Sequence, residues 1–211
     1  MIDRQRLLDT FLALAKIDSP SGEEAALRAA LEPRLRALGV EAHVDGTGNL
    51  QGRLPGRGAP LLLSAHMDTV PGRGIRPVVR EGVVYSDGTT ILGADDKSGI
   101  AVMLEVLAAL QGDAAQRPAV EIALSVGEEV GLLGAKGLDA GWFRAREALV
   151  LDMGGPLNVI VNAAPASDKF DAVVHGRAAH AGRLPRRRRR RDAGPGAGGV
   201  VVGRVLQLAQ A

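Results

Sequence analysis

The sequence contains no cysteine, and its 211 residues include only one Trp, one Tyr and three Phe. The absence of cysteine excludes disulfides, iron–sulfur clusters, thiol catalysis and cysteine-bound zinc. The scarcity of aromatic rings argues against a surface on which nucleic-acid bases stack. No stretch approaches the roughly 20 apolar residues of a membrane span, and the charged residues 1–16 do not resemble a signal peptide. These absences predict a cytoplasmic protein that has neither a membrane nor a nucleic acid as its evolved partner.

Charge is distributed unevenly along the chain, although the net charge is only +2. Residues 183–211 contain eight Arg against one Asp, whereas residues 1–182 contain 18 Lys and Arg against 23 Asp and Glu. Six consecutive arginines, from Arg186 to Arg191, precede a stretch of Gly, Pro and Ala that has no core pattern. Adjacent guanidinium groups repel, and such a stretch buries little apolar surface. We therefore predict that residues 183–211 form a disordered, low-complexity tail.

Hydrophobic periodicity predicts an α/β fold. Apolar residues recur at helical spacing at about residues 7–15, 23–38 and 96–110. Continuous apolar runs, typical of buried parallel strands, occupy residues 60–65, 119–126 and 148–151. Further strands are expected at 40–44, 49–54, 159–162 and 170–174, with a hairpin at 78–85 and a short helix near 132–135. Ser21 stands three residues before Glu24, a spacing that predicts a capping box at the start of the second helix. The alternation of strands and helices indicates a mixed, largely parallel sheet flanked by helices.

Acidic residues and one histidine follow the predicted strands or precede a predicted helix. They are His66 and Asp68, Asp95 and Asp96, Glu128 and Glu129, and Asp152. In open α/β sheets, sites form outside the carboxyl ends of the strands. So many carboxylates do not remain ionised together without a cation. A set of one imidazole and several carboxylates suits zinc, manganese or cobalt better than calcium.

Each of these motifs has an ordinary structural explanation when it is taken alone. A histidine at a strand end is commonly a hydrogen-bonded structural residue. Adjacent aspartates before a helix commonly cap it, and a pair of glutamates commonly faces solvent. Their joint occurrence, in order and at successive element ends, favours a metal site instead.

Five motifs together resemble the peptidase T-like branch of the two-zinc exopeptidases: SAHMDTV, GADDKSG, GEEVGLLGA, VLDMGGP and GRAAHAG. That superfamily also includes aminoacylases, glutamate carboxypeptidases and succinyl-diaminopimelate desuccinylase, and the resemblance covers roughly residues 3–182. It implies an M20-type metallopeptidase with a zinc-exopeptidase-like catalytic domain over residues 1–160. Residues 161–182 would then begin a smaller α+β lid and dimerisation domain, and a complete relative would form a homodimer.

The resemblance also implies a cofactor of two divalent metal ions, zinc above all, with cobalt or manganese as alternatives. His66 resembles the terminal ligand of one ion and Asp152 its remaining ligand. Asp95 resembles the carboxylate that bridges both ions, and Glu129 resembles a ligand of the second ion.

Three further residues have roles that the resemblance implies. Asp68 resembles the carboxylate that orients His66 through its other ring nitrogen. Glu128 resembles the general base that takes a proton from the attacking water. His180 resembles a lid-domain histidine that stabilises an oxyanion, often in the active site of a partner subunit. The resemblance further implies a cis peptide bond between Asp95 and Asp96.

The resemblance predicts hydrolysis of peptide bonds in small peptides by a tripeptidase or aminopeptidase. The alternatives within the superfamily are a carboxypeptidase and an N-acyl-amino-acid amidohydrolase. No histidine follows His180, whereas the family supplies its last metal ligand from a histidine near the C-terminus. The change of composition after Gly182 is what a reading-frame shift or a truncated gene model produces. We therefore expect a weakly active or inactive form, with a non-catalytic fragment, or a polyanion binder acting through Arg186 to Arg191, as alternatives of another class.

Overall fold

The computed structural model describes residues 1–112, 116–156 and 158–163. Beyond them it describes only the backbone of four short strands: β8 (Ser167–Asp168), β9 (Val173–Gly176), β10 (Gly199–Val202) and β11 (Leu208–Ala209). The chain divides into two compact units, Met1–Gly155 and Pro156–Ala211. The predictions for His180 and for the six consecutive arginines lie outside the described residues. The predicted boundaries at residues 160 and 182 stay predictions.

The first unit contains a five-stranded sheet of order β1-β2-β6-β3-β7. Its strands are β1 (Glu41–Val44), β2 (Leu50–Leu54), β3 (Arg57–His66), β6 (Pro118–Ser125) and β7 (Glu147–Val150). β3 runs parallel to both β6 and β7, whereas β2 runs antiparallel to β1 and β6. The predicted α/β fold with a mixed sheet is therefore confirmed, and its parallel part carries the strand ends that matter for function.

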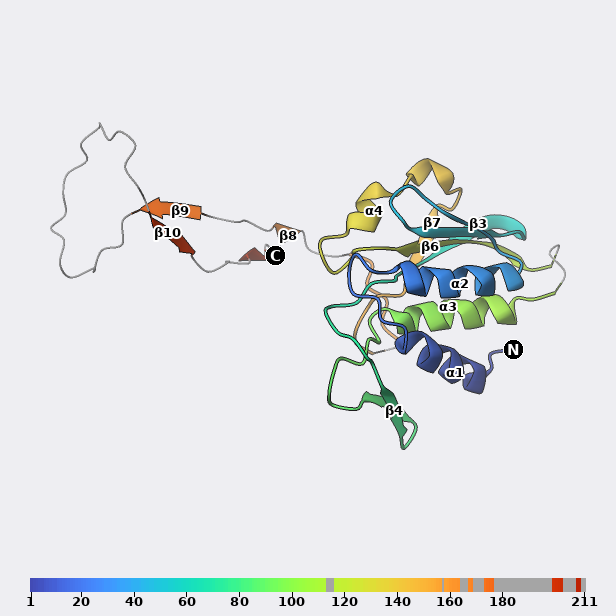
Figure 1. The fold of residues 1–211 in the computed structure, drawn as a ribbon. Helices are drawn as coiled ribbons and strands as arrows, with labels where there is room; N and C mark the ends of the chain where they lie inside the picture. Colours follow the sequence, from blue (N-terminus) through green and yellow to red (C-terminus); the bar gives the residue numbers. More distant parts are fainter. Residues whose placement is uncertain are drawn as a thin grey trace. The chain divides into compact units, whose positions relative to one another are not determined.

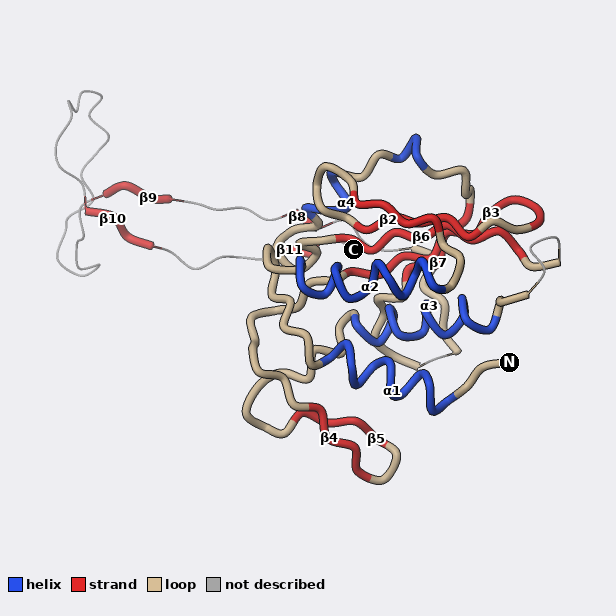
Figure 2. Tube along the Cα trace, turned by 45° about the vertical axis from the view of Figure 1, so that its right-hand side comes forward, coloured by secondary structure: helices blue, strands red, loops and turns tan. Residues whose placement is uncertain are grey.

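Helices α1 (Arg4–Ala15), α2 (Ala25–Ala37) and α3 (Lys97–Ala109) lie on one face of this sheet (Figures 1 and 2). The other face carries α4 (Leu133–Gly137) and a 3-10 turn at Ala140–Trp142. α2 presents one fully buried leucine on each turn, at positions 27, 31 and 35, which is the spacing of a helix that buries a single stripe. These leucines pack in one core with buried side chains of α3 and of the sheet, among them Ile100, Met103, Leu50 and Ile122.

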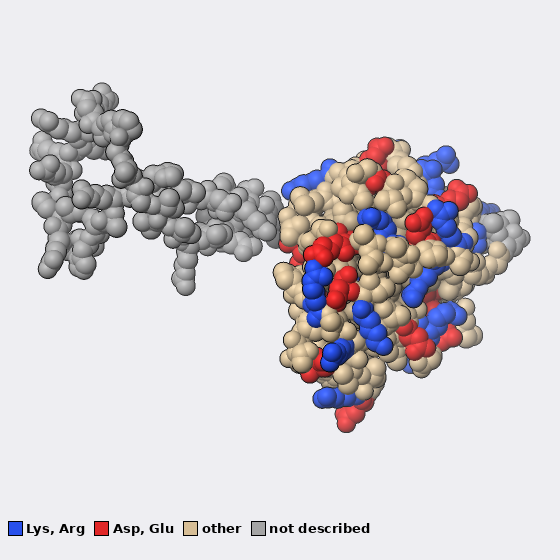
Figure 3. All heavy atoms as spheres, in the orientation of Figure 1, with Lys and Arg blue, Asp and Glu red and all other residues tan. Residues whose placement is uncertain are grey.

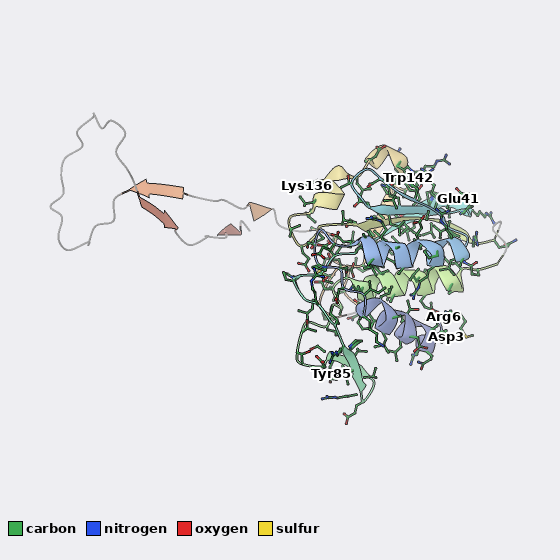
Figure 4. The ribbon with its side chains drawn as sticks, viewed as in Figure 1. Asp3, Arg6, Glu41, Tyr85, Lys136 and Trp142 are labelled. Atoms are coloured by element: carbon green, nitrogen blue, oxygen red, sulfur yellow. The ribbon has the colours of Figure 1, made fainter. Side chains whose placement is uncertain are left out.

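A hairpin formed by β4 (Pro77–Arg80) and β5 (Val83–Ser86) projects from the helical side, where Figure 4 labels its Tyr85. Its turn residues Glu81 and Gly82 have φ values of 51° and 78°, and positive φ at both positions is what a two-residue type I′ turn requires. On the face of the molecule drawn in Figure 3, basic and acidic side chains are intermixed. None of the described helices has the length and apolarity needed to cross a membrane, and the cytoplasmic location stays a prediction.

Three expectations from the sequence are wrong. The apolar strand β7 is exposed along its length, because it lies at the edge of the sheet with β3 as its paired neighbour. Residues 159–162 do not form a strand. The helix α2 begins without a side-chain cap, since Ser21 and Glu24 bind other parts of the chain.

The second unit contains two short antiparallel pairings, β9 with β10 and β8 with β11. β9 overlaps the predicted strand at residues 173 and 174. β10 and β11 fall within the segment predicted to be disordered, and the rest of that segment lies outside the described residues.

Candidate metal centre

Three loops follow the parallel strands β3, β6 and β7 and lie at the same end of the sheet. This end, at which the strands stop, is called the carboxyl edge here. His66 at the end of β3 stands opposite Ser125 at the end of β6, and the Met67 amide donates to the Ser125 carbonyl at 2.8 Å. On the other side of β3, the Leu151 amide donates to the Ser64 carbonyl at 2.9 Å. The residues that follow each strand, including Asp68, Glu128 and Asp152, therefore emerge at the same edge, as the sequence predicts.

His66 is the centre of this cluster and is 2% exposed. Its Nδ1 lies 2.8 Å from the backbone carbonyl of Asp68, and its Nε2 lies 3.0 Å from Asp95 Oδ1 and 3.8 Å from Asp152 Oδ2. In a neutral ring, a proton on Nδ1 that is donated to the carbonyl leaves the lone pair on Nε2. Nε2 is therefore the atom of His66 that is able to bind a metal, and it faces the two carboxylates.

The adjacent aspartates have different environments. Asp96 is buried and is the N-cap of α3, where its side chain accepts a hydrogen bond from the Gly99 amide at 3.2 Å. Its other carboxylate oxygen lies 3.3 Å from the His66 amide. The Asp95 side chain is 70% exposed and faces the imidazole. The peptide bond between the two is cis, as the resemblance implied.

The electrostatics of the cluster are those of several carboxylates around one imidazole. Burial alone would lower the pKa of His66, but Asp68, Asp95 and Asp152 raise it to about 10. Burial raises the pKa of Asp152, Glu128 and Glu129, and neighbouring carboxylates add to this effect while His66 opposes it. Burial likewise raises the pKa of Asp96 to about 7. Excess negative charge at this edge favours a bound cation.

The donor atoms fit a divalent metal. In each of two groups, His66 with Asp95 and Asp152 and His66 with Glu128 and Glu129, the potential ligand atoms lie within 4.8 Å of one another. One imidazole nitrogen and carboxylate oxygens form a donor set that suits zinc and related divalent metals. The four predicted ligands thus lie together, although Asp95 belongs to the first group only, so its bridging role stays a proposal.

The Asp68 carboxylate has more partners than the sequence indicates. It is fully buried and accepts hydrogen bonds from the Glu128 amide at 2.9 Å, the Glu129 amide at 3.1 Å and Ser21 Oγ at 2.7 Å. Burial alone would raise the pKa of Asp68, but its contacts with His66, Ser21 and the two amides lower it to about 2. The contact with the imidazole is longer, because Oδ1 lies 3.4 Å from His66 Nδ1. Asp68 therefore links the histidine to the two glutamates, and no pattern in the sequence indicates the Ser21 contact.

A cavity of about 250 Å³ adjoins the first group. Asp95 and Asp152 line it, together with Ala94, Asp96, Ser98, Leu151, Met153 and Gly154. Its position leaves room for a small molecule beside the proposed ligands.

A histidine–carboxylate cluster at the carboxyl edge of a mixed α/β sheet defines the class of metal-binding α/β proteins to which zinc exopeptidases belong. The sequence model of peptidase family M28 matches residues 38–183, more than half of the chain, and the chain belongs to this family. The family is one of metallopeptidases, which implies a divalent metal. The M20-type assignment is not confirmed.

Several relatives are similar over much of the chain. The uncharacterized protein YqjE of Bacillus subtilis is 41% identical over 196 residues, which covers 88% of this chain and 53% of YqjE. The crystal structure of aminopeptidase PepT from Bacillus cereus is 40% identical, with a TM-score of 0.79 over 86% of this chain and 52% of PepT. A tripeptidase from Staphylococcus aureus is 39% identical, with a TM-score of 0.70 over 74% of this chain and 45% of its own. The chain spans about half the length of these relatives.

Proposed function

We propose that the chain belongs to a metal-dependent exopeptidase that hydrolyses peptide bonds in small peptides. The observation that carries this proposal is the convergence of His66, Asp95, Asp152, Glu128 and Glu129 at one edge of the sheet. When bound, a divalent ion supplies a Lewis acid and lowers the pKa of water. The similarity to PepT and to a tripeptidase supports peptides with a free amino terminus as substrates, and the proposal of a peptidase T-like enzyme of the M20 type rests on the resemblance of the five sequence motifs.

The five residues divide into ligands and a base. His66, Asp95 and Asp152 would hold one divalent ion, zinc above all, while Asp95 and Glu129 would hold a second. Only Nε2 of His66 is free to bind a metal, because Nδ1 lies against the Asp68 carbonyl. The second ion is then held, among the described residues, by carboxylates alone. We therefore propose one tight and one weaker site, and a correspondingly weak activity for this chain.

Glu128 is the proposed general base. Its side chain is half-buried beside the ligands, and burial raises its pKa above the usual value of a glutamate, a direction that suits a group that takes and returns a proton. In this role Glu128 accepts a proton from the attacking water and delivers it to the leaving amine. His180 as an oxyanion donor and a homodimer of the complete enzyme also belong to this proposal.

Calorimetric titration with zinc tests the metal centre. We expect one tight site, and we expect His66→Ala to weaken it by more than the 10–100-fold that is typical of residues outside the ligand shell. His43→Ala is the matched control, because His43 lies on β1 and stacks on Trp142. Absence of zinc binding, or equal binding by the His66→Ala variant, would contradict the proposal.

Hydrolysis assays test the direction of cleavage and the base. A tripeptide with both ends free is compared with its N-acetylated and C-amidated forms, and loss of cleavage on acetylation is the aminopeptidase result. Cleavage of the free and acetylated forms but not of the amidated form would indicate a carboxypeptidase, and cleavage of the acetylated form alone would indicate an N-acyl-amino-acid amidohydrolase. Glu128→Gln should abolish whatever cleavage is measured while zinc binding persists, and Glu147→Gln, at an exposed position of β7, should change neither.

A further inference from the structure

The connection between α1 and α2 runs along the metal centre. Within residues 17–24, called the connector here, Ser19 Oγ donates to the Met67 carbonyl at 2.9 Å and the Ser19 carbonyl accepts from the Thr69 amide at 2.9 Å. Pro20 and Thr69 form an isolated parallel bridge. The connector also meets α3, because the buried Lys97 Nζ donates to the Ile17 carbonyl at 2.6 Å. None of its residues belongs to the proposed ligands, yet it contacts two of the elements that carry them.

Two polar side chains of the connector extend this contact to the loop after β6. Ser21 Oγ donates to Asp68 Oδ2 at 2.7 Å. Glu24 is 5% exposed, and its Oε1 accepts from the Gly127 amide at 3.0 Å and from the Gly22 amide at 2.9 Å. These are the two residues whose spacing predicted a capping box. They leave α2 without a side-chain cap and contact residues at the edge of the metal centre instead.

The loop that carries the two glutamates is held through its backbone. The amides of three consecutive residues each donate to a buried carboxylate: Gly127 to Glu24, and Glu128 and Glu129 to Asp68. Gly127 has a φ of +59°, and a Cβ there would lie 3.1 Å from the Cβ of Leu133. A chain of amides bound in this way fixes the direction in which the following side chains leave the backbone.

We propose that Glu24, assisted by Ser21 through Asp68, is a positioning residue that holds the loop 127–129 so that Glu129 faces the metal centre. This inference rests on the proposed function. Glu24 acts on the loop directly, through the Gly127 amide. Ser21 acts through Asp68, which keeps two amide donors when the hydroxyl is removed, so its effect should be smaller.

The test compares cobalt binding by conservative and disruptive variants of the whole chain. Glu24→Ala removes the acceptor of the Gly127 amide, whereas Glu24→Gln retains an Oε1 acceptor. Ser21→Ala and Ser21→Thr form the same kind of pair for the hydroxyl. Glu23→Ala is the matched control, because the neighbouring carboxylate is exposed and pairs with Arg73. Cobalt(II) absorption is titrated at a temperature where every variant is folded.

We expect Glu24→Ala to weaken the weaker cobalt site by about 10–100-fold, the range for residues that orient metal ligands. Affinity at the tighter site of His66, Asp95 and Asp152 should change little, and Glu24→Gln should restore the weaker site. A merely structural role would lower the thermal midpoint without this selective loss. Hydrogen exchange of the metal-free chain supplies a second measurement, because the Gly127 amide should exchange faster in Glu24→Ala than in Glu23→Ala.

Four outcomes would overturn the inference. Wild-type affinity in Glu24→Ala, or equal weakening of both sites, would show that Glu24 does not position Glu129, while the proposed metal centre would stand. If Glu24→Ala does not fold, equal cobalt binding by Glu24→Gln, Ser21→Ala and Ser21→Thr would show that the connector does not position Glu129. Failure of the unaltered chain to bind cobalt would overturn the proposed function and the inference together.

Discussion

The strand β6 carries the buried carboxylate of Glu121 in its first half, and the carboxylates of Glu128 and Glu129 follow its end. Negative charge has cationic partners at the first position and lacks them at the second. Glu121 is 2% exposed. It accepts hydrogen bonds from the Arg144 amide at 2.8 Å and the Ala145 amide at 2.9 Å, and Arg53 Nε lies 3.5 Å from it. Arg53 in turn lies over the Trp142 ring, 3.9 Å from its centroid, and donates to the Trp142 carbonyl. Figure 4 shows Trp142 on the α4 side of the sheet.

At the other end of the strand, negative charge is not balanced by lysine or arginine. Among the described residues, the ion pairs of Asp95 and Asp152 are with His66 alone, and none involves Glu128 or Glu129. A buried charge that keeps its partners is tolerated in a fold, and the fold is destabilised when one partner is removed. Partly buried charges without partners destabilise the fold until a cation binds. The comparison therefore separates two regions. The balanced region consists of Glu121, Arg53 and Trp142, and the unbalanced region consists of His66 with Asp95, Asp152, Glu128 and Glu129.

The largest expected effect comes from removing the carboxylate of the balanced region. Glu121→Ala leaves two amides without their acceptor and the Arg53 guanidinium without its charged partner, and loss of one partner of such a buried arrangement costs about 3–5 kcal/mol. Urea unfolding of the metal-free chain, followed by circular dichroism, measures this loss. Glu121→Gln keeps oxygen acceptors for the amides and should lose less. Unchanged zinc affinity in the folded Glu121→Gln variant is expected, and a large decrease would refute the separation of the two regions.

The unbalanced region predicts a dependence of stability on pH in the metal-free chain. The pKa of His66 is raised from 6.5 to about 10, so its contribution is fully present below pH 6.5 and is lost as the pH rises towards 10. Lys97 has a pKa lowered to about 8 by burial and opposes this trend only above that pH. Between pH 6.5 and 8, with chelator present, the free energy of unfolding should fall by about 1–2 kcal/mol, since one proton corresponds to 1.36 kcal/mol per pH unit.

A His66→Gln variant sharpens that measurement. Without the imidazole, the slope between pH 6.5 and 8 should become smaller, and the part that remains is that of Asp96, because burial raises its pKa to about 7 and its contribution is also lost as the pH rises through that value. An equally steep fall in the variant would mean that another group carries the pH dependence.

The sequence predicted which residues lie together at the candidate site better than it predicted the hydrogen bonds that hold them in place. Parallel strands end at one edge of a sheet, so residues that directly follow them, such as His66 and Glu128, are brought together by topology alone. Asp95 and Asp96 differ in environment because Asp96 caps α3. Two adjacent aspartates in a sequence do not show which of them is the cap.

The supports were missed because their partners are distant in sequence. Ser21 contacts Asp68 across 47 positions, and Glu24 contacts Gly127 across 103. Their own spacing of three residues matches a capping box, and this local pattern favoured the wrong partner. The strand β7 shows the converse error, because its apolar composition predicted burial, whereas its position in the sheet decides its exposure.

A smaller effect of the opposite sign is expected at the unbalanced region. Asp152→Asn removes one carboxylate whose pKa burial and Asp95 raise, so repulsion within the metal-free cluster decreases. We expect the metal-free variant to be more stable than the metal-free wild-type chain by about 1 kcal/mol, which is typical of substitutions that stabilise a protein at the cost of its function. With saturating zinc, the wild-type chain should be the more stable of the two. It binds zinc more tightly, and tighter binding to the folded state adds more to the free energy of unfolding. Thermal unfolding with chelator and with zinc measures both, and a variant that is less stable under both conditions would contradict the repulsion.

The smallest effect concerns the stacking that completes the balanced region. Trp142→Leu keeps an apolar side chain and the backbone carbonyl that Arg53 binds, but removes the aromatic face under the guanidinium. Such a contact at a partly exposed arginine is worth about 0.5–1 kcal/mol, and the loss should appear in urea unfolding followed by circular dichroism, since Trp142 is the one tryptophan of the sequence. In the Glu121→Gln background the same substitution should cost less, because Arg53 is then no longer fixed by a charged partner. Equal costs in the two backgrounds would mean that stacking and the ion pair act independently, and the balanced region would be a set of separate contacts rather than one cooperative arrangement.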